Sequence, residues 1–343
     1  MTRWAVILAG GVGSRFWPLS TPRRPKQLLP LVDDAPLLVN AVRRLTPLIP
    51  ADRTIIVTNR SLTAAIGELL PDLPAENIIG EPRAAGTAPA LAWAALEIER
   101  RDGPSAVMIC VHADWSVGQP EEFRRVLVLA ADAANAHRSL VTVGIVPARA
   151  DPGFGYIQPG AEMGDARRVA RFVEKPDAAT AERMIAAGYL WNSGIFVWRV
   201  DDFLAEVRAH SPEVSRAMLG TESGIEAFFQ RVTPITVDHG VLERSDRVLV
   251  IPGDFEWDDV GTWAALRRVR RLDGDGNSAA GAVQAIASRG NVVHAEGTTV
   301  VLYGVDDLVV VARDGVTLVT TTDRAANLKA LLDALPSDIR DRA

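Results

Sequence analysis

A glycine-rich turn near the start of the chain has the composition of a phosphate-binding loop. Residues 10–15 read Gly-Gly-Val-Gly-Ser-Arg and directly follow an apolar run at residues 4–9. Because glycine has no Cβ, the backbone N–H groups of such a turn can converge on an anion. A tight connection without a ligand is the alternative, so the turn by itself indicates phosphate only in general terms.

The turn matches neither of two common nucleotide-binding loops. No Lys-Ser or Lys-Thr pair follows the last glycine, as a Walker A loop requires. Phe16 stands where a dinucleotide fingerprint has its third glycine, although Asp33 and Asp34 lie at about the distance at which that fold binds ribose. Prolines at positions 18, 22 and 25 would interrupt the helix that the dinucleotide fold needs. These departures disfavour a Rossmann oxidoreductase.

Cationic side chains follow the turn in a proline-stiffened loop. Arg15 is succeeded by Arg23, Arg24 and Lys26. Cations beside an anion-binding turn suit a triphosphate, which carries several negative charges in a small volume. For Arg23 and Arg24 a solvated basic loop is an equal alternative, whereas Lys26 is the stronger candidate for a phosphate contact.

Two aspartates are candidates for a cation site. Asp114 follows the apolar run 106–111, and an open α/β sheet places ligand groups at the carboxyl ends of its strands. Asp259 comes from far along the chain, next to the chemically identical Asp258. An isolated aspartate after a strand is more often a helix N-cap. These residues alone therefore favour a cap over a cation site.

Composition and charge argue against several classes of protein. The 343 residues carry a formal net charge of −6, which disfavours a broad basic surface for nucleic acid or an anionic membrane. The single cysteine, Cys110, cannot form an internal disulfide, and the five histidines lack metal-like spacing. The sequence has no cationic leader, no apolar run of membrane-span length and no GxSxG motif. We therefore expect a cytoplasmic protein with small-molecule partners, without nucleic acid or membrane.

Strands alternating with helices must position these residues. Continuous apolar runs typical of buried parallel strands occur at residues 4–9, 54–57, 106–111 and 140–146. Stretches with apolar residues at three and four spacing predict helices at residues 37–48, 62–70, 88–99 and 121–136. This alternation predicts an α/β fold.

The rhythm changes in the middle of the chain and again near its end. Expected strands at residues 154–158, 169–173 and 190–199 lie among expected helices at 178–187 and 201–208, as an inserted substrate-covering region would. A turn-rich linker at 273–278 then leads to short valine-rich strands, whose turns suggest a meander, and to a helix around 327–335. We expect one domain at residues 1–270 and a small β-rich domain at residues 271–343 that ends in a helix.

The motif series resembles the sugar nucleotidyltransferase family. The segment LAGGVGSRFWPLSTPRRPKQLLPL at residues 8–31 is similar to the family signature, and its FWPLS and PKQ pieces resemble the bacterial mannose-1-phosphate guanylyltransferase branch. Further motifs follow in the family's order: EP at 81–82, TAPA at 87–90, GYI at 155–157, FVEKP at 172–176, WNSGIF at 191–196, and the stretches 238–243 and 257–263. The resemblance covers essentially the whole chain and implies a short form without the isomerase domain of longer relatives.

The resemblance implies a Mg²⁺-dependent enzyme of GDP-mannose biosynthesis. A mannose-1-phosphate oxygen would attack the α-phosphate of GTP and release pyrophosphate, a reaction that asks the protein mainly for alignment and charge neutralisation. The implied catalytic residues are Arg15, Lys26, Asp114 and Asp259, of which Asp114 and Asp259 would bind the metal. The implied nucleotide-binding residues are Leu8, Gly10, Gly11, Gly13, Ser14, Arg15, Lys26, Glu81 and Thr87. The implied sugar-phosphate-binding residues are Gly155, Tyr156, Glu174, Lys175 and Asn192.

The resemblance also implies a Rossmann-like, mostly parallel mixed sheet flanked by helices, of the nucleotide-diphospho-sugar transferase type. For the β-rich tail it suggests a short left-handed β-helix, although no hexapeptide repeat is evident. Apolar strands in this tail would suit a homodimer.

The base pocket departs from the family pattern. Ala85 and Gly86 stand where the family commonly has a basic residue and an asparagine, and the usual Pro-x-Asp-His appears as His-Ala-Asp-Trp at 112–115. Glu81 could still accept hydrogen bonds from the Watson–Crick edge of guanine. Base choice, the exact sugar phosphate and a non-catalytic relative that binds a nucleotide sugar therefore stay open.

Overall fold

The computed structural model describes residues 2–11, 13–219 and 224–340, which form two compact units. The first unit comprises Met1–Gly10, Val42–His112 and Gln119–Phe255, and the second comprises Gly11–Ala41, Ala113–Gly118 and Glu256–Ala343. The expected domain boundary at residue 270 stays a prediction.

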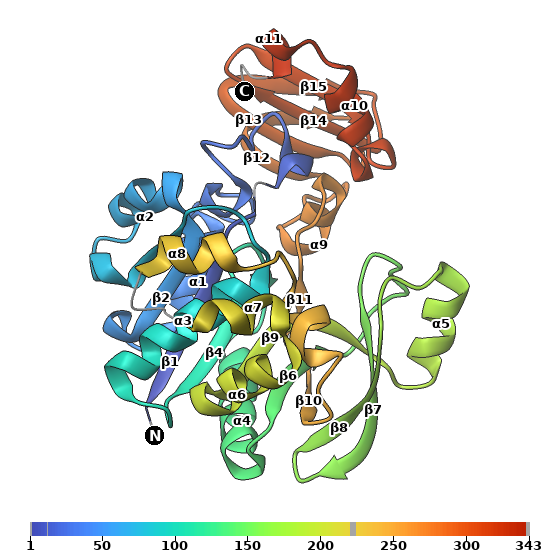
Figure 1. Cartoon of the computed structure of the whole chain (residues 1–343). Coiled ribbons are helices and arrows are strands. Elements are labelled where there is room, and N and C mark those ends of the chain that lie inside the picture. Colours follow the sequence, from blue (N-terminus) through green and yellow to red (C-terminus); the bar gives the residue numbers. More distant parts are fainter. Residues whose placement is uncertain (1, 12, 220–223, 341–343) are drawn as a thin grey trace. The chain divides into compact units, whose positions relative to one another are not determined.

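The first unit is built on a mixed sheet in which the described residues contribute nine strands (Figure 1). In spatial order these are β3 (Ile78–Glu81), β2 (Thr54–Asn59), β1 (Arg3–Ala9), β4 (Val107–His112), β9 (Leu190–Arg199), β6 (Leu140–Ile145), β10 (Val248–Gly253), β8 (Ala166–Val173) and β7 (Tyr156–Met163). The pairings make β8 and β9 run opposite to the other strands. The expected mostly parallel mixed sheet is thus confirmed.

Helices bury both faces of this sheet. In β1, Trp4 and Val6 join one apolar cluster, whereas their neighbours Ala5 and Ile7 are equally buried and point to the opposite face by strand alternation. The first face is covered by α3 (Thr87–Asp102), α6 (Val200–His210), α7 (Pro212–Met218) and α8 (Gly224–Arg231). The helix α4 (Pro120–His137) packs on β4, β6, β9 and β10.

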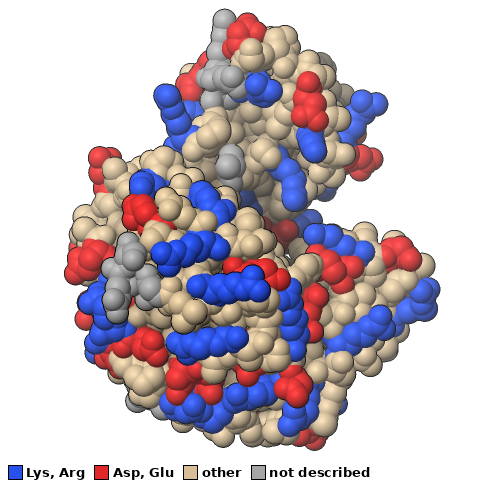
Figure 2. Space-filling view, in the orientation of Figure 1, with Lys and Arg blue, Asp and Glu red and all other residues tan. Residues whose placement is uncertain are grey.

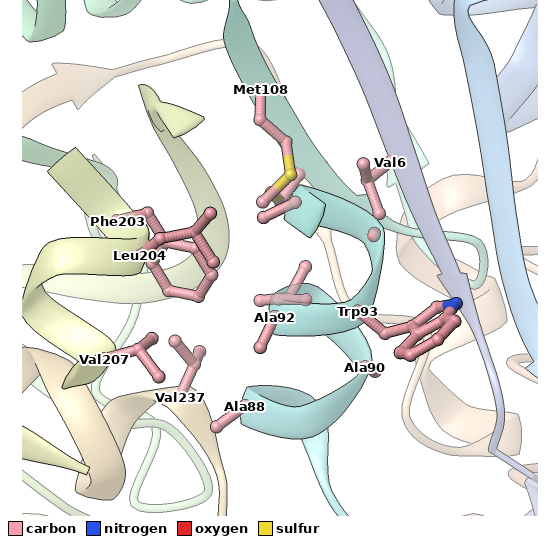
Figure 3. Close-up of a cluster of buried hydrophobic side chains, with 14 of the residues drawn as sticks. Val6, Ala88, Ala90, Ala92, Trp93, Met108, Phe203, Leu204, Val207 and Val237 are labelled. Atoms are coloured by element: carbon pink, nitrogen blue, oxygen red, sulfur yellow. The ribbon is translucent and has the colours of Figure 1, made fainter. Parts of the chain in front are cut away.

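The central helix α3 is buried because its sequence is rich in alanine. Figure 3 shows Ala88 of α3 beside Val207 and Val237, in the cluster that also contains Ala92, Phe203 and Met108. Small side chains let a helix lie close to several neighbours, and the larger residues of α6 then fill the remaining volume. The remaining helices of the first unit and its border are α1 (Leu37–Leu45), α2 (Thr63–Leu69) and α5 (Ala178–Ala186).

The second unit joins the start of the chain to its end. Phe16, Leu19 and Leu29 share an apolar core with Trp263 and Val311. Its elements are the ribbon of β5 (Ser116–Val117) and β11 (Trp257–Asp258), the helix α9 (Leu266–Val269), the strands β12 (Ser278–Ile286), β13 (Val292–Tyr303), β14 (Leu308–Arg313) and β15 (Val316–Thr321), and the helices α10 (Lys329–Ala334) and α11 (Ser337–Arg340). The expected β-rich tail with a terminal helix is therefore present.

The tail strands do not form the expected meander. The consecutive strands β12, β13 and β14 pair in parallel, and only β14 and β15 pair antiparallel. Parallel pairing of successive short strands is the arrangement of a β-helix coil, and its left-handed sense stays a prediction. Buried asparagines stack between the coils, where Asn291 Nδ2 donates to Asn277 Oδ1 over 2.9 Å and to the Val305 carbonyl over 3.0 Å.

The surface in view carries both signs of charge. Figure 2 shows acidic and basic side chains interspersed on this face, as the modest net charge of −6 would lead one to expect. None of the helices in the described ranges is both long enough and apolar enough for a membrane span. The expected cytoplasmic location stays a prediction.

Candidate active site

The short ribbon of β5 and β11 aligns the two candidate metal-binding aspartates. Asp258 pairs with Ser116 in antiparallel register, so Asp114 before one strand and Asp259 after the other come to the same end of the ribbon. Trp115 and Trp257 stack edge to face across it, with ring centroids 5.7 Å apart. Two residues far apart in the sequence are thereby held together within the second unit.

Lys26 connects these aspartates. Its ammonium donates to Asp114 Oδ2 over 3.0 Å and to the backbone carbonyl of Asp259 over 2.8 Å. The Lys26 side chain is only 6% exposed, and its Nζ lies 5.7 Å from the centroid of the Phe16 ring. These two bonds hold the buried ammonium in one place. Loss of its partners would leave a buried charge uncompensated, which is strongly destabilising.

Gly13 permits this placement of Lys26. Its φ of 68° lies in the left-handed region, and a Cβ at this position would lie 2.3 Å from Lys26 Cβ. The Gly13 carbonyl accepts from Ser20 Oγ over 2.6 Å, which holds the turn in place. The next residue, Ser14, begins a single 3₁₀ turn. The sequence indicates Gly13 as part of an anion-binding turn. The packing of Lys26 is a second reason why this position needs glycine.

The other residues of the predicted phosphate loop are more open. Gly11 is exposed, and a Cβ there would meet no described atom within 4 Å. Arg15 is exposed and donates to the Gly261 carbonyl over 3.2 Å, beside Asp259. Val12, the central residue of the loop motif, lies outside the described residues. The described loop residues of the second unit thus leave backbone and guanidinium N–H groups accessible to an anion.

The donor set around Asp259 suits a hard divalent cation. Burial raises the pKa of the Asp259 carboxyl, the neighbouring Asp258 raises it further, and Lys26 opposes both. In the described part of the chain no three His, Cys, Asp or Glu side chains gather closely enough to hold a metal by themselves. Mg²⁺ commonly takes one or two carboxylates and completes its shell with water and substrate phosphate oxygens. Asp114 and Asp259 fit that pattern.

Asp258 has a different role from Asp259. Its buried carboxylate accepts from Arg268 over 2.6 and 3.1 Å and from the Val260 backbone N–H over 2.9 Å. Val260 is a β-branched residue with φ 47°, an uncommon conformation that needs support from its surroundings. The sequence cannot separate the two aspartates, whereas the contacts assign Asp258 to holding the turn that presents Asp259.

In the first unit, Glu81 lies beside Gly10. Gly10 follows β1 and Glu81 ends β3, the two strands on either side of β2, and a Cβ on Gly10 would lie 3.4 Å from Glu81 Oε2. Burial raises the pKa of Glu81 to about 7. Leu8, another predicted nucleotide contact, is buried in β1. A half-buried carboxyl of this kind gains from a ligand that donates hydrogen bonds to its ionised form.

The unusual Gly86 is explained by a neighbouring backbone. Its φ is 86°, and a Cβ there would lie 2.3 Å from the Ile235 carbonyl oxygen. Thr87, the first residue of α3, accepts from the Val237 N–H through its Oγ1 over 2.9 Å. Any side chain at position 86, including the asparagine expected from the resemblance, would therefore clash with this backbone.

Gly155, Glu174 and Asn192 come together as predicted sugar-contacting residues. A Cβ on Gly155 would lie 2.8 Å from Glu174 Oε2 and 3.6 Å from Asn192 Cβ, and the Asn192 N–H donates to the Gly155 carbonyl over 2.8 Å. Lys175 pairs with Glu174 over 2.9 Å. The hydroxyl of Tyr156 instead bonds the backbone of Asp151 at 3.1 Å. Any contact of Tyr156 with a sugar would therefore come from other atoms.

Asp238 contacts this group, although the sequence analysis assigns it no specific role. Asn192 Nδ2 donates to Asp238 Oδ1 over 2.8 Å. Asp238 begins a one-turn π-helix, Asp238–Leu242, a rare element that often marks functional sites. The sequence signal is only the position of Asp238 at the start of the motif 238–243.

Comparisons with known proteins agree with this arrangement. Residues 4–276 match the family model described as nucleotidyl transferase. The chain is 35% identical over 351 residues to the xanthan biosynthesis protein XanB of Xanthomonas campestris pv. campestris (strain B100), covering 98% of this chain and 74% of that protein. It is 33% identical to a mannose-1-phosphate guanylyltransferase of Salmonella muenchen, with the same coverage.

One solved structure is similar to this protein along nearly the whole length of both chains. It is described as mannose-1-phosphate geranyltransferase from Thermus thermophilus, with a TM-score of 0.89 and 33% identity, covering 97% of this chain and 99% of that one. The fold is therefore that of the nucleotide-diphospho-sugar transferases. With a family model over most of its length and relatives above 30% identity, the chain belongs to the nucleotidyl transferase family.

Proposed function

We propose that the chain is a mannose-1-phosphate guanylyltransferase. A phosphate oxygen of mannose-1-phosphate attacks the α-phosphorus of GTP, the bond from that phosphorus to the bridging oxygen breaks, and GDP-mannose and pyrophosphate leave. The observation that carries this proposal is the Lys26 ammonium, which joins the Asp114 carboxylate to the Asp259 backbone. Nucleotidyl transfer depends mainly on such preorganised charge.

The residues on the phosphate side have distinct roles in this proposal. Lys26 and Arg15 neutralise the triphosphate, and the backbone of Gly10, Gly11, Gly13 and Ser14 binds its oxygens. Members of the family generally use a divalent metal. Asp114 and Asp259 would hold Mg²⁺, which when bound supplies positive charge to the reacting phosphate oxygens.

The first unit supplies recognition of base and sugar. Ionised Glu81 accepts from the N1–H and the exocyclic amine of guanine, and Thr87 contributes from the start of α3. Glu174 and Asn192 bind hexose hydroxyls, while Lys175 neutralises the sugar phosphate. Guanine is favoured over other bases because its edge offers two adjacent donors to one carboxylate.

A substrate panel tests the proposal. Purified protein is incubated with Mg²⁺, each of the four nucleoside triphosphates and several hexose-1-phosphates, and pyrophosphate release is measured. The expected result is the highest kcat/KM for GTP with mannose-1-phosphate. A higher kcat/KM for another pair would replace the proposed substrates, and no release with any pair would refute the reaction class.

We also propose that the protein forms a homodimer through its tail. Four large apolar side chains of the tail strands are exposed, namely Ile286, Val301, Tyr303 and Val319. Exposed apolar groups on one small sheet favour association with a similar surface. Replacing Tyr303 and Val301 by serine should convert a dimer to a monomer in analytical ultracentrifugation, and a wild-type monomer at all concentrations would refute this.

A further inference from the structure

Residues 235–238 form a segment that contacts both substrate-binding groups of the first unit. At one end the Ile235 N–H donates to the Ala85 carbonyl over 3.0 Å, and the Ala88 N–H donates to the Ile235 carbonyl over 3.2 Å. At the other end Asp238 accepts from the Asn192 side chain. We name residues 235–238 the connecting segment.

The hydrogen bonds of Asn192 define the orientation of its amide. An ionised carboxylate can only accept, so the amide nitrogen must face Asp238 Oδ1, 2.8 Å away. A backbone N–H can only donate, so the amide oxygen must face Gly194 N, 3.3 Å away. Both contacts require the same orientation. One amide N–H and one oxygen lone pair then remain in a defined order for a ligand.

Asp238 is itself held by the backbone. Its carbonyl accepts from the Glu243 N–H over 2.8 Å, the five-residue spacing of the π-helix. The preceding residue, Val237, is tied through its N–H to Thr87 Oγ1 over 2.9 Å. Asp238 is half-buried. Hydrogen bonds of the residue before it and of the π-helix after it therefore hold its backbone in place.

We propose that Asp238 is a positioning residue for sugar recognition, which acts by orienting the Asn192 amide toward the hydroxyl groups of the hexose-1-phosphate. The inference rests on the proposed function, which assigns Asn192 to the sugar. Without Asp238 only the longer contact with the Gly194 N–H opposes a 180° rotation that exchanges the donor of the amide for its acceptor. Discrimination between hexoses that differ at one hydroxyl then falls, because the order of donor and acceptor reads that difference.

The test uses three substitutions and the whole protein. Asp238→Ala should raise KM for mannose-1-phosphate about tenfold, the scale of one lost hydrogen bond to a charged group, and leave KM for the nucleotide within about twofold. Asp238→Asn should recover most of the loss, because its side-chain oxygen can still accept from Asn192. The control Asp72→Ala removes an exposed carboxylate from the same unit and should change neither KM.

A double-mutant cycle separates positioning from direct contact. If Asp238 acts through Asn192, then Asn192→Ala and the double variant Asn192→Ala/Asp238→Ala have equal KM values for the sugar phosphate. Additive effects, or an equal rise in the nucleotide KM, would overturn the proposal. If Asp238→Ala fails to fold, Asp238→Leu provides the second variant, because leucine keeps a side chain of similar size but has no acceptor for the Asn192 amide, and it should raise the same KM.

The outcome is distinguishable from failure of the proposed function. If wild-type protein prefers another substrate pair, the same variants are measured with that pair, and loss of sugar KM still supports the role of Asp238. If wild-type protein shows no turnover, calorimetry with mannose-1-phosphate compares the dissociation constants of wild type and Asp238→Ala. Equal dissociation constants would refute the inference, and a weaker constant in the variant would support it.

Discussion

The groups around Lys26 and around Asn192 are built in opposite ways. Lys26 is 6% exposed and bonded to two residues, whereas the ion pair of Glu174 with Lys175 has side chains that are 50% and 65% exposed. The first group uses charges that are already in place, and the second uses polar groups that water can reach. Charge that stabilises a transition state gains from being fixed in advance, while a sugar with several hydroxyls needs accessible donors and acceptors. In the proposed function, the first group therefore serves the rate of the reaction and the second serves selectivity for the sugar.

Removal of one carboxylate near Lys26 should give the largest effect. Asp114→Asn or Asp259→Asn should lower kcat by roughly 10²–10³-fold, the scale of losing one preorganised charge-stabilising group. Initial rates of pyrophosphate release at saturating Mg²⁺ measure this. Asp34→Asn, an exposed change in the same unit, is the matched control and should keep the wild-type kcat. Near-normal kcat in both site variants would show that these carboxylates do not serve the reaction.

A methyl group at position 13 should disturb the same group through packing. Gly13→Ala places a Cβ 2.3 Å from Lys26 Cβ at a positive φ, so the turn or the lysine must move. We expect a loss of roughly 1–3 kcal/mol in the free energy of unfolding, together with a lower kcat. Urea titration and initial rates measure the two effects. For comparison, Gly274→Ala adds a Cβ in open space without positive φ and should be nearly neutral in stability.

Titration of Glu81 should give the base side of the first unit a pH dependence of its own. Burial raises its pKa from the ordinary 4.5 to about 7. Between these pH values the folded protein binds more protons at Glu81 than the unfolded chain, so the free energy of unfolding falls as pH rises through this window. The loss is at most about 3 kcal/mol. Glu81→Gln should remove this part of the pH dependence.

Urea titrations of wild type and Glu81→Gln at pH 5 and pH 8 provide the measurement. The stability of wild type relative to the variant should be lower at pH 8 than at pH 5. In the proposed function the ionised carboxylate binds guanine, so the wild-type KM for GTP should also fall as pH rises from 6 to 8. Parallel stability curves for the two proteins would contradict the raised pKa.

The sequence predicts the elements of the sheet better than the contacts between distant residues. The apolar runs at 54–57 and 106–111 are the strands β2 and β4, because burial on both faces leaves a continuous local signal. Residues 278–321 carry strand signals as well, but the choice of parallel over antiparallel partners depends on chain paths that local patterns do not contain. The same limit applies to side chains in the candidate site.

The sequence motifs predict which site residues the structure brings together. Only the contacts of each residue distinguish its role from that of its neighbours. Lys26, Asp114 and Asp259 meet as one group, although their roles in catalysis stay predictions. The adjacent and chemically identical Asp258 and Asp259 differ in their contacts: Asp258 accepts from Arg268, ten residues away, whereas the Asp259 carbonyl accepts from Lys26. Asp238 contacts Asn192 across 46 residues, and no spacing rule connects such a pair.

The smallest predicted effect concerns Glu296 in β13. Its carboxylate accepts from both terminal nitrogens of Arg24, at 3.0 and 3.1 Å, and lies 3.1 Å from Arg313 Nε. Arg24 precedes Lys26 by two residues. This contact therefore ties the tail strands to residues 24–26, which we call the lysine loop, within the second unit. Glu296→Gln should cost about 1 kcal/mol in the free energy of unfolding, since the carboxylate is partly exposed and screened.

Kinetics of the same variant test whether the tail supports the group around Lys26. If the tie holds the lysine loop, Glu296→Gln lowers kcat by less than the aspartate variants do and leaves KM for the sugar phosphate unchanged. The control Asp314→Asn removes a carboxylate that also pairs with Arg313, at 2.8 Å, but is 62% exposed and makes no contact with Arg24. A change in sugar-phosphate KM with an unchanged kcat would break the division of rate and selectivity between the two groups. An unchanged kcat together with lower stability would limit the tail to a structural role, because the fixed charge of Lys26 would then depend on Asp114 and Asp259 alone.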